Sequence, residues 1–213
     1  KESSYFIRTF QIEQGELAYD SGLEAHRLSP KMIGKTLNPS HLAFKNINFQ
    51  VDSVFYCGRD IRASIKRLDA KERCGLEWVS TEGRLIADNQ VINIPHLVMK
   101  TSGSSLDLQT KIGWDVLEMK QSGILSARVS AQIGKNDMIK TIGGMDCAFV
   151  RTYPAKPLLL RVEAKGDLNS LRLKTLDVEL PGSFEMKAKG DLLHLADSTR
   201  RGGEINLSAE TRD

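Results

Sequence analysis

The chain has 213 residues, of which 40% are hydrophobic and 27% are charged, a composition that allows a buried apolar surface and excludes intrinsic disorder. Its net charge of +3 is small and its basic residues alternate with apolar ones, so nucleic acid is not an expected partner. No apolar stretch approaches the roughly 18 residues that a transmembrane helix needs.

Alternation of apolar and polar residues runs along most of the chain, and this period of two is typical of β-strands. It begins at Phe6–Ile12, continues through residues 42–51 and 61–65, and recurs as far as Phe184–Ala188. About fourteen such segments follow one another, separated by turn-forming Gly, Pro and Asp residues. The sequence therefore predicts an all-β fold with a long antiparallel, meandering arrangement of strands.

Three stretches interrupt the alternation. Residues 21–38 have no clean period and predict a long loop. Asp115–Gln121 and Asn136–Ile142 each predict a turn or two of helix, the second with Asn136 or Asp137 as its cap. Short helices are therefore expected as minor elements beside the strands.

A short repeat near the C-terminus favours regularly stacked hairpins. The residues Ala164–Leu168, with the sequence AKGDL, recur as Ala188–Leu192 after 24 residues, which is about the length of one hairpin. Because turn, face and strand recur together, we expect near-equivalent strand pairs at these two positions.

Residues for catalysis or metal binding form no recognisable pattern. The histidines are isolated, and the three cysteines, Cys57, Cys74 and Cys147, lack the spacing of a metal site. These cysteines are expected to be small strand hydrophobes, with one disulfide between Cys57 and Cys74 as the alternative. Residues 33–36 resemble the end of a phosphate-binding loop, but Ser29 stands where that loop requires glycine. We therefore predict no enzymatic activity, no catalytic residues, no metal and no cofactor.

The apolar side of the strands allows two architectures. In a closed β-sandwich two sheets cover each other, whereas in an open, U-shaped sheet the apolar side chains line a groove. Aromatic residues make up only 6% of the chain, and an aliphatic lining suits extended acyl chains and an ordinary core alike. The residues expected to line such a groove are Ile47, Phe49, Val51, Ile61, Ala63, Ile65, Leu106, Leu108, Val129, Ala131, Leu160, Val162, Leu173, Val178, Phe184 and Met186.

A series of strand-like segments carries a resemblance to a known family. The segments are Leu37–Leu42, Ile47–Val54, Glu72–Leu76, Ile92–Leu97, Thr101–Leu108 and Ile133–Met138. Together with the Gly-x-Leu repeats at Gly166 and Gly190, they resemble the AsmA-like family, in its translocation and assembly module (TamB) branch. The resemblance extends over most of residues 37–209.

The resemblance implies a fold and a role that spacing alone does not show. Members are anchored in the inner membrane of Gram-negative bacteria by one N-terminal helix, and their periplasmic part is a long β-sheet folded like a taco around a hydrophobic groove. They are implicated in moving phospholipids to the outer membrane and in assembling outer-membrane β-barrel proteins. This chain lacks the anchor helix and a recognisable C-terminal domain of the family, so it would be a middle periplasmic segment.

We therefore expect one continuous domain with both ends truncated. Residues 1–36 would supply N-terminal strands and a loop of the same sheet, and residues 37–213 the repetitive groove segment. The expected partners are phospholipid acyl chains, the flanking segments of the same long chain and an outer-membrane β-barrel assembly protein. The alternative is a closed β-sandwich acting as a structural or adhesive module that binds protein or carbohydrate.

Overall fold

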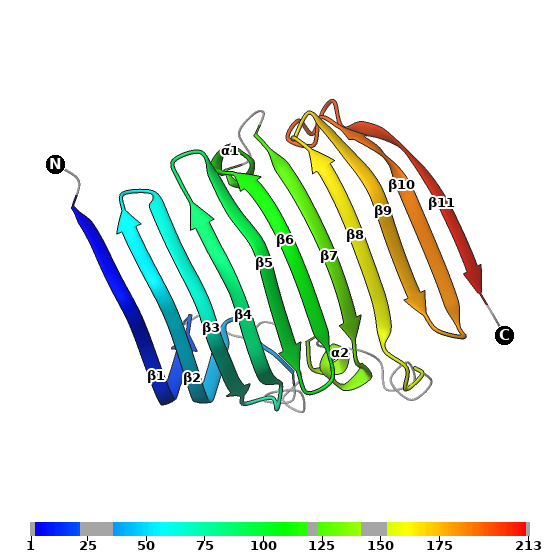
Figure 1. Ribbon diagram of the computed structural model, residues 1–213. Coiled ribbons are helices and arrows are strands. Elements are labelled where there is room, and N and C mark those ends of the chain that lie inside the picture. The colour runs from blue at the N-terminus through cyan, green and yellow to red at the C-terminus, as the bar shows by residue number, and fades with distance from the viewer. Residues whose placement is uncertain (1–2, 22–35, 119–122, 142–152, 212–213) are drawn as a thin grey trace.

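The described residues form a single antiparallel sheet of eleven strands arranged in chain order, with two short helices. The computed structural model describes residues 3–21, 36–118, 123–141 and 153–211. Each strand pairs with the strands before and after it, so the sheet is a meander with open edges at its first and last strands (Figure 1). The predicted all-β, antiparallel, meandering fold is confirmed. The strands are β1 Ser4–Asp20, β2 His41–Cys57, β3 Asp60–Glu72, β4 Glu77–Ala87, β5 Val91–Thr101, β6 Ser105–Gly113, β7 Leu125–Ile133, β8 Leu158–Gly166, β9 Ser170–Leu180, β10 Phe184–Leu193 and β11 Gly202–Thr211.

Fewer strands than segments are present because some strands contain two alternating segments. β1 contains both the segment at Phe6–Ile12 and the one at residues 17–19, and β9 contains both the segment at residues 171–173 and the one at residues 176–180. The alternation changes phase between the two segments, where the register with the neighbouring strand shifts. A β-bulge adds one residue without ending a strand, and the sequence pattern alone presents it as a break.

Both short helices overlap the segments that the sequence predicts to be helical. α1 spans Trp114–Leu117, and α2 spans Lys135–Thr141. Residues 119–121 and Ile142 of the predicted helices, and residues 22–35 of the predicted loop, lie outside the described residues. Neither described helix combines the length and the apolar character that crossing a membrane requires.

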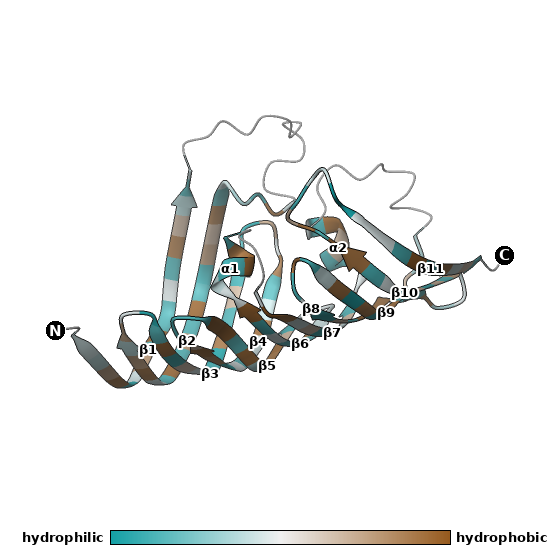
Figure 2. Ribbon diagram, turned by 90° about the horizontal axis from the view of Figure 1, so that it is seen from above, coloured by the Kyte–Doolittle hydropathy of each residue, from teal (hydrophilic) through white to brown (hydrophobic). Residues whose placement is uncertain are grey.

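The sheet is curled, and its N-terminal strands bend most sharply. Figure 2 shows that β1 and β2 turn steeply partway along, while α1 and α2 lie on the inner side of the curve. Three residues of these strands adopt left-handed backbone conformations, namely Gln14 (φ 52°), Asn46 (φ 53°) and Ser53 (φ 55°). The register shifts at or beside the same residues. Bulges therefore bend these strands without interrupting their pairing.

The AKGDL repeat marks two places where neighbouring backbones approach closely. Gly166 ends β8 with a φ of 152°, and a Cβ atom there would collide with the carbonyl oxygen of Ser170. At Gly190 in β10, a Cβ atom would collide with the carbonyl oxygen of Glu204 on β11. The repeat thus places glycine where the next strand occupies the space of a side chain.

Replacing Gly166 by Ala is expected to lower the free energy of unfolding by about 1–3 kcal/mol, because the new methyl group meets backbone and the φ angle is unfavourable for an L residue. Gly202→Ala is the control, since the nearest heavy atom to a Cβ there is the carbonyl oxygen of Arg200 at 3.9 Å. Urea unfolding followed by circular dichroism measures both. Equal unfolding midpoints for the two variants would contradict the close approach.

Candidate groove on the inner face of the sheet

The pairing register joins apolar side chains from all eleven strands on one face of the sheet. Residues paired across antiparallel strands point to the same face, so successive pairs trace a row. One row crosses the entire sheet and contains only apolar residues and glycine. From β1 to β11 it consists of Phe10, Val51, Ile65, Gly83, Leu97, Leu108, Val129, Val162, Leu176, Ala188 and Leu207.

Two further rows run beside it, and we call the face that carries all three the apolar face. One starts at Tyr5 and passes through Ile61, Ile92 and Leu125 before ending at Gly203. The other starts at Thr81 and consists otherwise of Met99, Leu106, Ala131, Leu160, Val178, Met186 and Ala209.

All of the predicted lining residues lie on the apolar face. Eleven of them belong to the three rows, and Ile47, Phe49, Ala63, Leu173 and Phe184 share the face through their own pairs or their place in the alternation. The prediction missed every residue that β1, β4, β5 and β11 contribute. A register shift between Ile94 and Leu97 changes the phase of β5, so its alternation is visible only as two short pieces.

The apolar face is only partly covered. The predicted lining residues are half-buried, apart from Val51 and Ala131, which are 6% and 8% exposed. No large side chain of the described residues falls below 2% exposure, a level that a sealed core between two layers would produce. Within the part of the chain that the structure describes, the apolar face therefore lies against no second sheet.

Burial also identifies the apolar face as the inner one. Its buried residues include the small side chains of Ala87, Ala131, Ala164 and Ala188, because a curled sheet crowds the side chains on its concave side. Helix α2 lies over the same side, since the carboxylate of Asp137 accepts a hydrogen bond from the hydroxyl of Thr101, which shares a face with Met99 (Figure 2). The groove is thus bordered by the curl of the sheet and by the helices.

The outer face is charged. Glu163 lies 2.9 Å from the ammonium of Lys174 and 3.5 Å from the guanidinium of Arg128, and these cations hold the pKa of its carboxyl below the usual value. Such exposed pairs add little stability, but they keep this face hydrated. The local hollows of the outer face, such as the one of about 440 Å³ beside Arg84 and His96, are bordered by charged side chains and suit no acyl chain.

Two helices lie at the ends of the middle strands, at opposite margins of the groove (Figure 1). Asp137 of α2 is 4% exposed and accepts a hydrogen bond of 2.7 Å from the hydroxyl of Ser104, in the turn before β6. The ammonium of Lys140 donates to the carbonyl oxygen of Gly75, in the turn between β3 and β4, at 2.6 Å. At the other end, Trp114 of α1 donates through Nε1 to the carbonyl oxygen of Asp88 at 2.6 Å.

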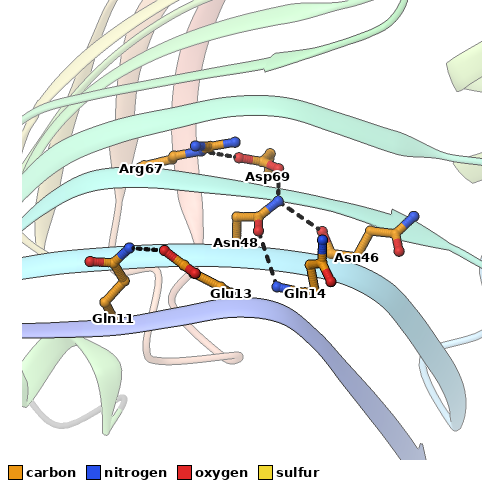
Figure 3. Close-up of polar contacts among 7 residues, drawn as sticks. All are labelled: Gln11, Glu13, Gln14, Asn46, Asn48, Arg67 and Asp69. Carbon is orange, nitrogen blue, oxygen red and sulfur yellow. Dashed lines mark hydrogen bonds and ion pairs between the residues drawn. The ribbon is translucent and has the colours of Figure 1, made fainter.

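A polar network holds the bend of the first three strands (Figure 3). The amide nitrogen of Asn48 donates to Asp69 at 2.6 Å, and its amide oxygen accepts from the backbone N–H of Gln14 at 3.1 Å. Burial alone would raise the pKa of Asp69, but the hydrogen bonds from Arg67 and Asn48 outweigh it and hold that pKa below its usual value. The network joins β1, β2 and β3 where the backbone is irregular.

Glu72 anchors the end of β3 in a similar way. Glu72 is only 3% exposed. Its carboxylate accepts hydrogen bonds from the backbone N–H of Ala43 at 3.1 Å and from that of Cys74 at 2.5 Å. Burial acts to raise the pKa of Glu72, and the hydrogen bonds from Cys74, Ala43 and Arg73 together reverse that effect and lower it. Cys74 is not joined to Cys57, so the alternative of a disulfide between them is wrong, and Cys147 lies outside the described residues.

Stability is expected to fall as the pH drops through the lowered pKa of Glu72. The folded carboxylate has a pKa below its ordinary value of 4.5, so its contribution is complete above that value and is lost under more acidic conditions. Glu72→Gln is expected to cost about 1–3 kcal/mol at neutral pH and to flatten the acid limb of the stability profile. Urea unfolding at several pH values measures this, with Glu77→Gln on the exposed start of β4 as the control. An unchanged acid limb in Glu72→Gln would refute the role of the carboxylate.

Comparison with known proteins adds no constraint on the groove. No family model matches the chain, and neither a curated protein nor a solved structure matches it. The interpretation of the apolar face therefore depends on the residues and the register described above.

Proposed function

We propose that the apolar face binds phospholipid acyl chains and that this chain is a periplasmic segment of a protein bridging the inner and outer membranes, of the AsmA-like family in its TamB branch. The observation that carries the proposal is the apolar row from Phe10 to Leu207, which no polar side chain interrupts. Acyl chains need a continuous apolar wall and no polar partners, and this row offers that environment.

Energetics favour an occupant for this face. Apolar surface left in water costs roughly 25 cal/mol per Å², and contiguous apolar patches of several hundred Å² usually mark binding surfaces. The lining residues are only partly buried and lie on the inner side of the curl, where a bound acyl chain would contact them. Binding would remove this surface from water without any change in the sheet.

The length of the row suits transport along the sheet. Eleven strands with a spacing of about 4.8 Å extend the row over about 48 Å, from the first to the last of the described strands. The inner-membrane anchor, the flanking segments and the outer-membrane β-barrel assembly partner follow from the family resemblance, as does a second role in assembling outer-membrane proteins.

The alternative of a closed sandwich that binds protein or carbohydrate is less well supported. A sandwich needs two facing sheets, and the described strands form one. Carbohydrate binding favours exposed aromatic rings; Tyr5, Phe6, Phe10, Tyr19 and Tyr56 are exposed, whereas both tryptophans are engaged within the structure. Trp78 packs against Phe44 with ring centroids 5.5 Å apart, and the indole N–H of Trp114 bonds to Asp88.

Purified protein is expected to carry phospholipid, detectable by mass spectrometry of an organic extract. A photoreactive residue at position 129 should crosslink to that lipid, while one at the neighbouring position 130 should not, because Val129 lies on the apolar face and Ser130 on the outer face. Val129→Asp is expected to reduce bound lipid about tenfold or more, since a charge within an apolar contact is costly. Ser130→Asp is the matched control. Absence of lipid together with equal crosslinking at both positions would refute the proposal.

A further inference from the structure

Two polar side chains of β4 face the groove beside the bent strands. Trp78 pairs with Thr101 of β5, and Thr81 pairs with Met99. Because Thr101 and Met99 are two residues apart, their partners on β4 lie on the same face, which is the apolar face. The register shift between Trp78 and Ser80 accommodates the extra residue between the two positions. The indole and the hydroxyl therefore share one part of the groove.

Neither of these groups has a strong hydrogen-bond acceptor. Thr81 is 5% exposed, and its hydroxyl has no hydrogen-bond partner among the described residues. The indole N–H of Trp78 donates to the thioether sulfur of Met99 at 3.0 Å, and this sulfur is a weak acceptor. A buried polar group without a partner destabilises a fold. Two such donors on the wall of a groove indicate a ligand that carries an acceptor.

The two donors lie in a corner of the groove, which we define by Phe44, Trp78, Thr81 and Met99. β1 and β2 turn steeply toward the inner side of the curl and stand beside the floor that the later strands form (Figure 2). Phe44, which precedes the irregular residue Asn46 of β2, packs on Trp78 with ring centroids 5.5 Å apart. A ligand in this corner would contact both the floor and the bent strands.

Met99 is the adaptable side of the corner. It is only half-buried, so its side chain borders the groove. Methionine has three rotatable side-chain bonds and repacks readily. Rotation of the thioether would release the indole N–H of Trp78. Because Met99 lies directly across from Thr81, the same movement would open space beside the hydroxyl.

The charges around the corner favour a neutral acceptor. Two buried carboxylates lie at this margin of the groove, since Glu72 pairs with Phe44 and Asp137 of α2 accepts a hydrogen bond from Thr101. The ammonium of Lys140, also at this margin, donates to a backbone carbonyl at 2.6 Å. A phosphate or a free carboxylate would be repelled by the two acids. An ester carbonyl offers an acceptor oxygen without a negative charge.

We infer that the corner binds an ester carbonyl of a lipid, with the indole N–H of Trp78 and the hydroxyl of Thr81 as its donors. The inference rests on the proposed function, because it places the polar end of a lipid whose acyl chain lies on the apolar face. An acyl chain begins at its ester carbonyl, so a chain held at the corner would extend over the later strands toward β11. The corner would thus fix where along the groove the lipid rests.

Competition between an ester lipid and its ether analogue tests the role of the carbonyl. Protein is incubated with vesicles that hold equal amounts of dipalmitoyl phosphatidylethanolamine and its dihexadecyl ether, which has the same headgroup and chain length but no carbonyl. Bound lipids are then extracted, and their ratio is measured by mass spectrometry. The unmodified chain is expected to hold the ester in about tenfold excess, since two neutral hydrogen bonds depend on the carbonyl.

Removal of the donors is expected to reduce this excess. Trp78→Phe keeps a ring against Phe44, and Thr81→Val keeps the shape of the side chain. Each should lower the excess about threefold, and the double variant should bring the ratio close to unity. Thr110→Val is the matched control, because Thr110 lies on the apolar face but its hydroxyl donates to the carbonyl oxygen of Ser126 at 3.1 Å.

Urea unfolding checks the fold of these variants. Thr81→Val is expected to be at least as stable as the unmodified chain, because the hydroxyl that it removes has no partner among the described residues. A change in its lipid ratio is then attributable to the lost donor.

Two results would overturn the inference while lipid is still bound and the proposed function stands. One is an equal ratio of ester and ether in the unmodified chain. The other is an excess of ester that Trp78→Phe and Thr81→Val leave unchanged, or that Thr110→Val reduces as much as they do. Binding of neither lipid, by contrast, would refute the proposed function and this inference together.

Discussion

The structure depends on a pairing register that keeps one set of side chains on the same face through eleven strands. The side-chain period of a strand is two, so a slip of one residue at any pair would turn the apolar set outward. β9 shows how the register is kept. One extra residue between Leu173 and Leu176 returns Leu171 and Leu173 to the face already occupied by Val178, and the neighbouring strands stay in step.

A sheet held in this way is a single layer, and different contacts stabilise its middle and the ends of its strands. Small residues such as Ala131 and Ala164 are buried by their neighbours on the concave face, while no large side chain of the described part is fully enclosed. Two buried carboxylates act near the ends of strands. Glu72 accepts hydrogen bonds from the backbone N–H groups of Ala43 and Cys74, and Asp137 of α2 accepts one from the hydroxyl of Ser104, in the turn before β6. The middle of the sheet relies on cross-strand contacts and the ends on polar anchors.

A single layer also leaves two kinds of surface unsatisfied. Among the described residues, the apolar face has no second sheet over it, and β1 and β11 each pair with one strand. The two surfaces suit different partners. Flexible acyl chains can cover an apolar face, but only another strand can complete the backbone hydrogen bonds of an edge strand. The charged outer face requires no such cover, since its ion pairs, such as Arg172 and Asp191 at 2.8 Å, are exposed to solvent.

The sequence by itself determined the fold class, the two short helices and the face on which each predicted lining residue lies, because alternation is local to a strand and survives in any antiparallel sheet. Only the tertiary structure decided that the strands form one sheet and not two, that phase changes at Pro95–His96 and in β9 are bulges within strands, and that Asp137 reaches Ser104. Those features depend on which strands meet and in what register. Two residues far apart in the chain carry no mark of that meeting until the backbone brings them together.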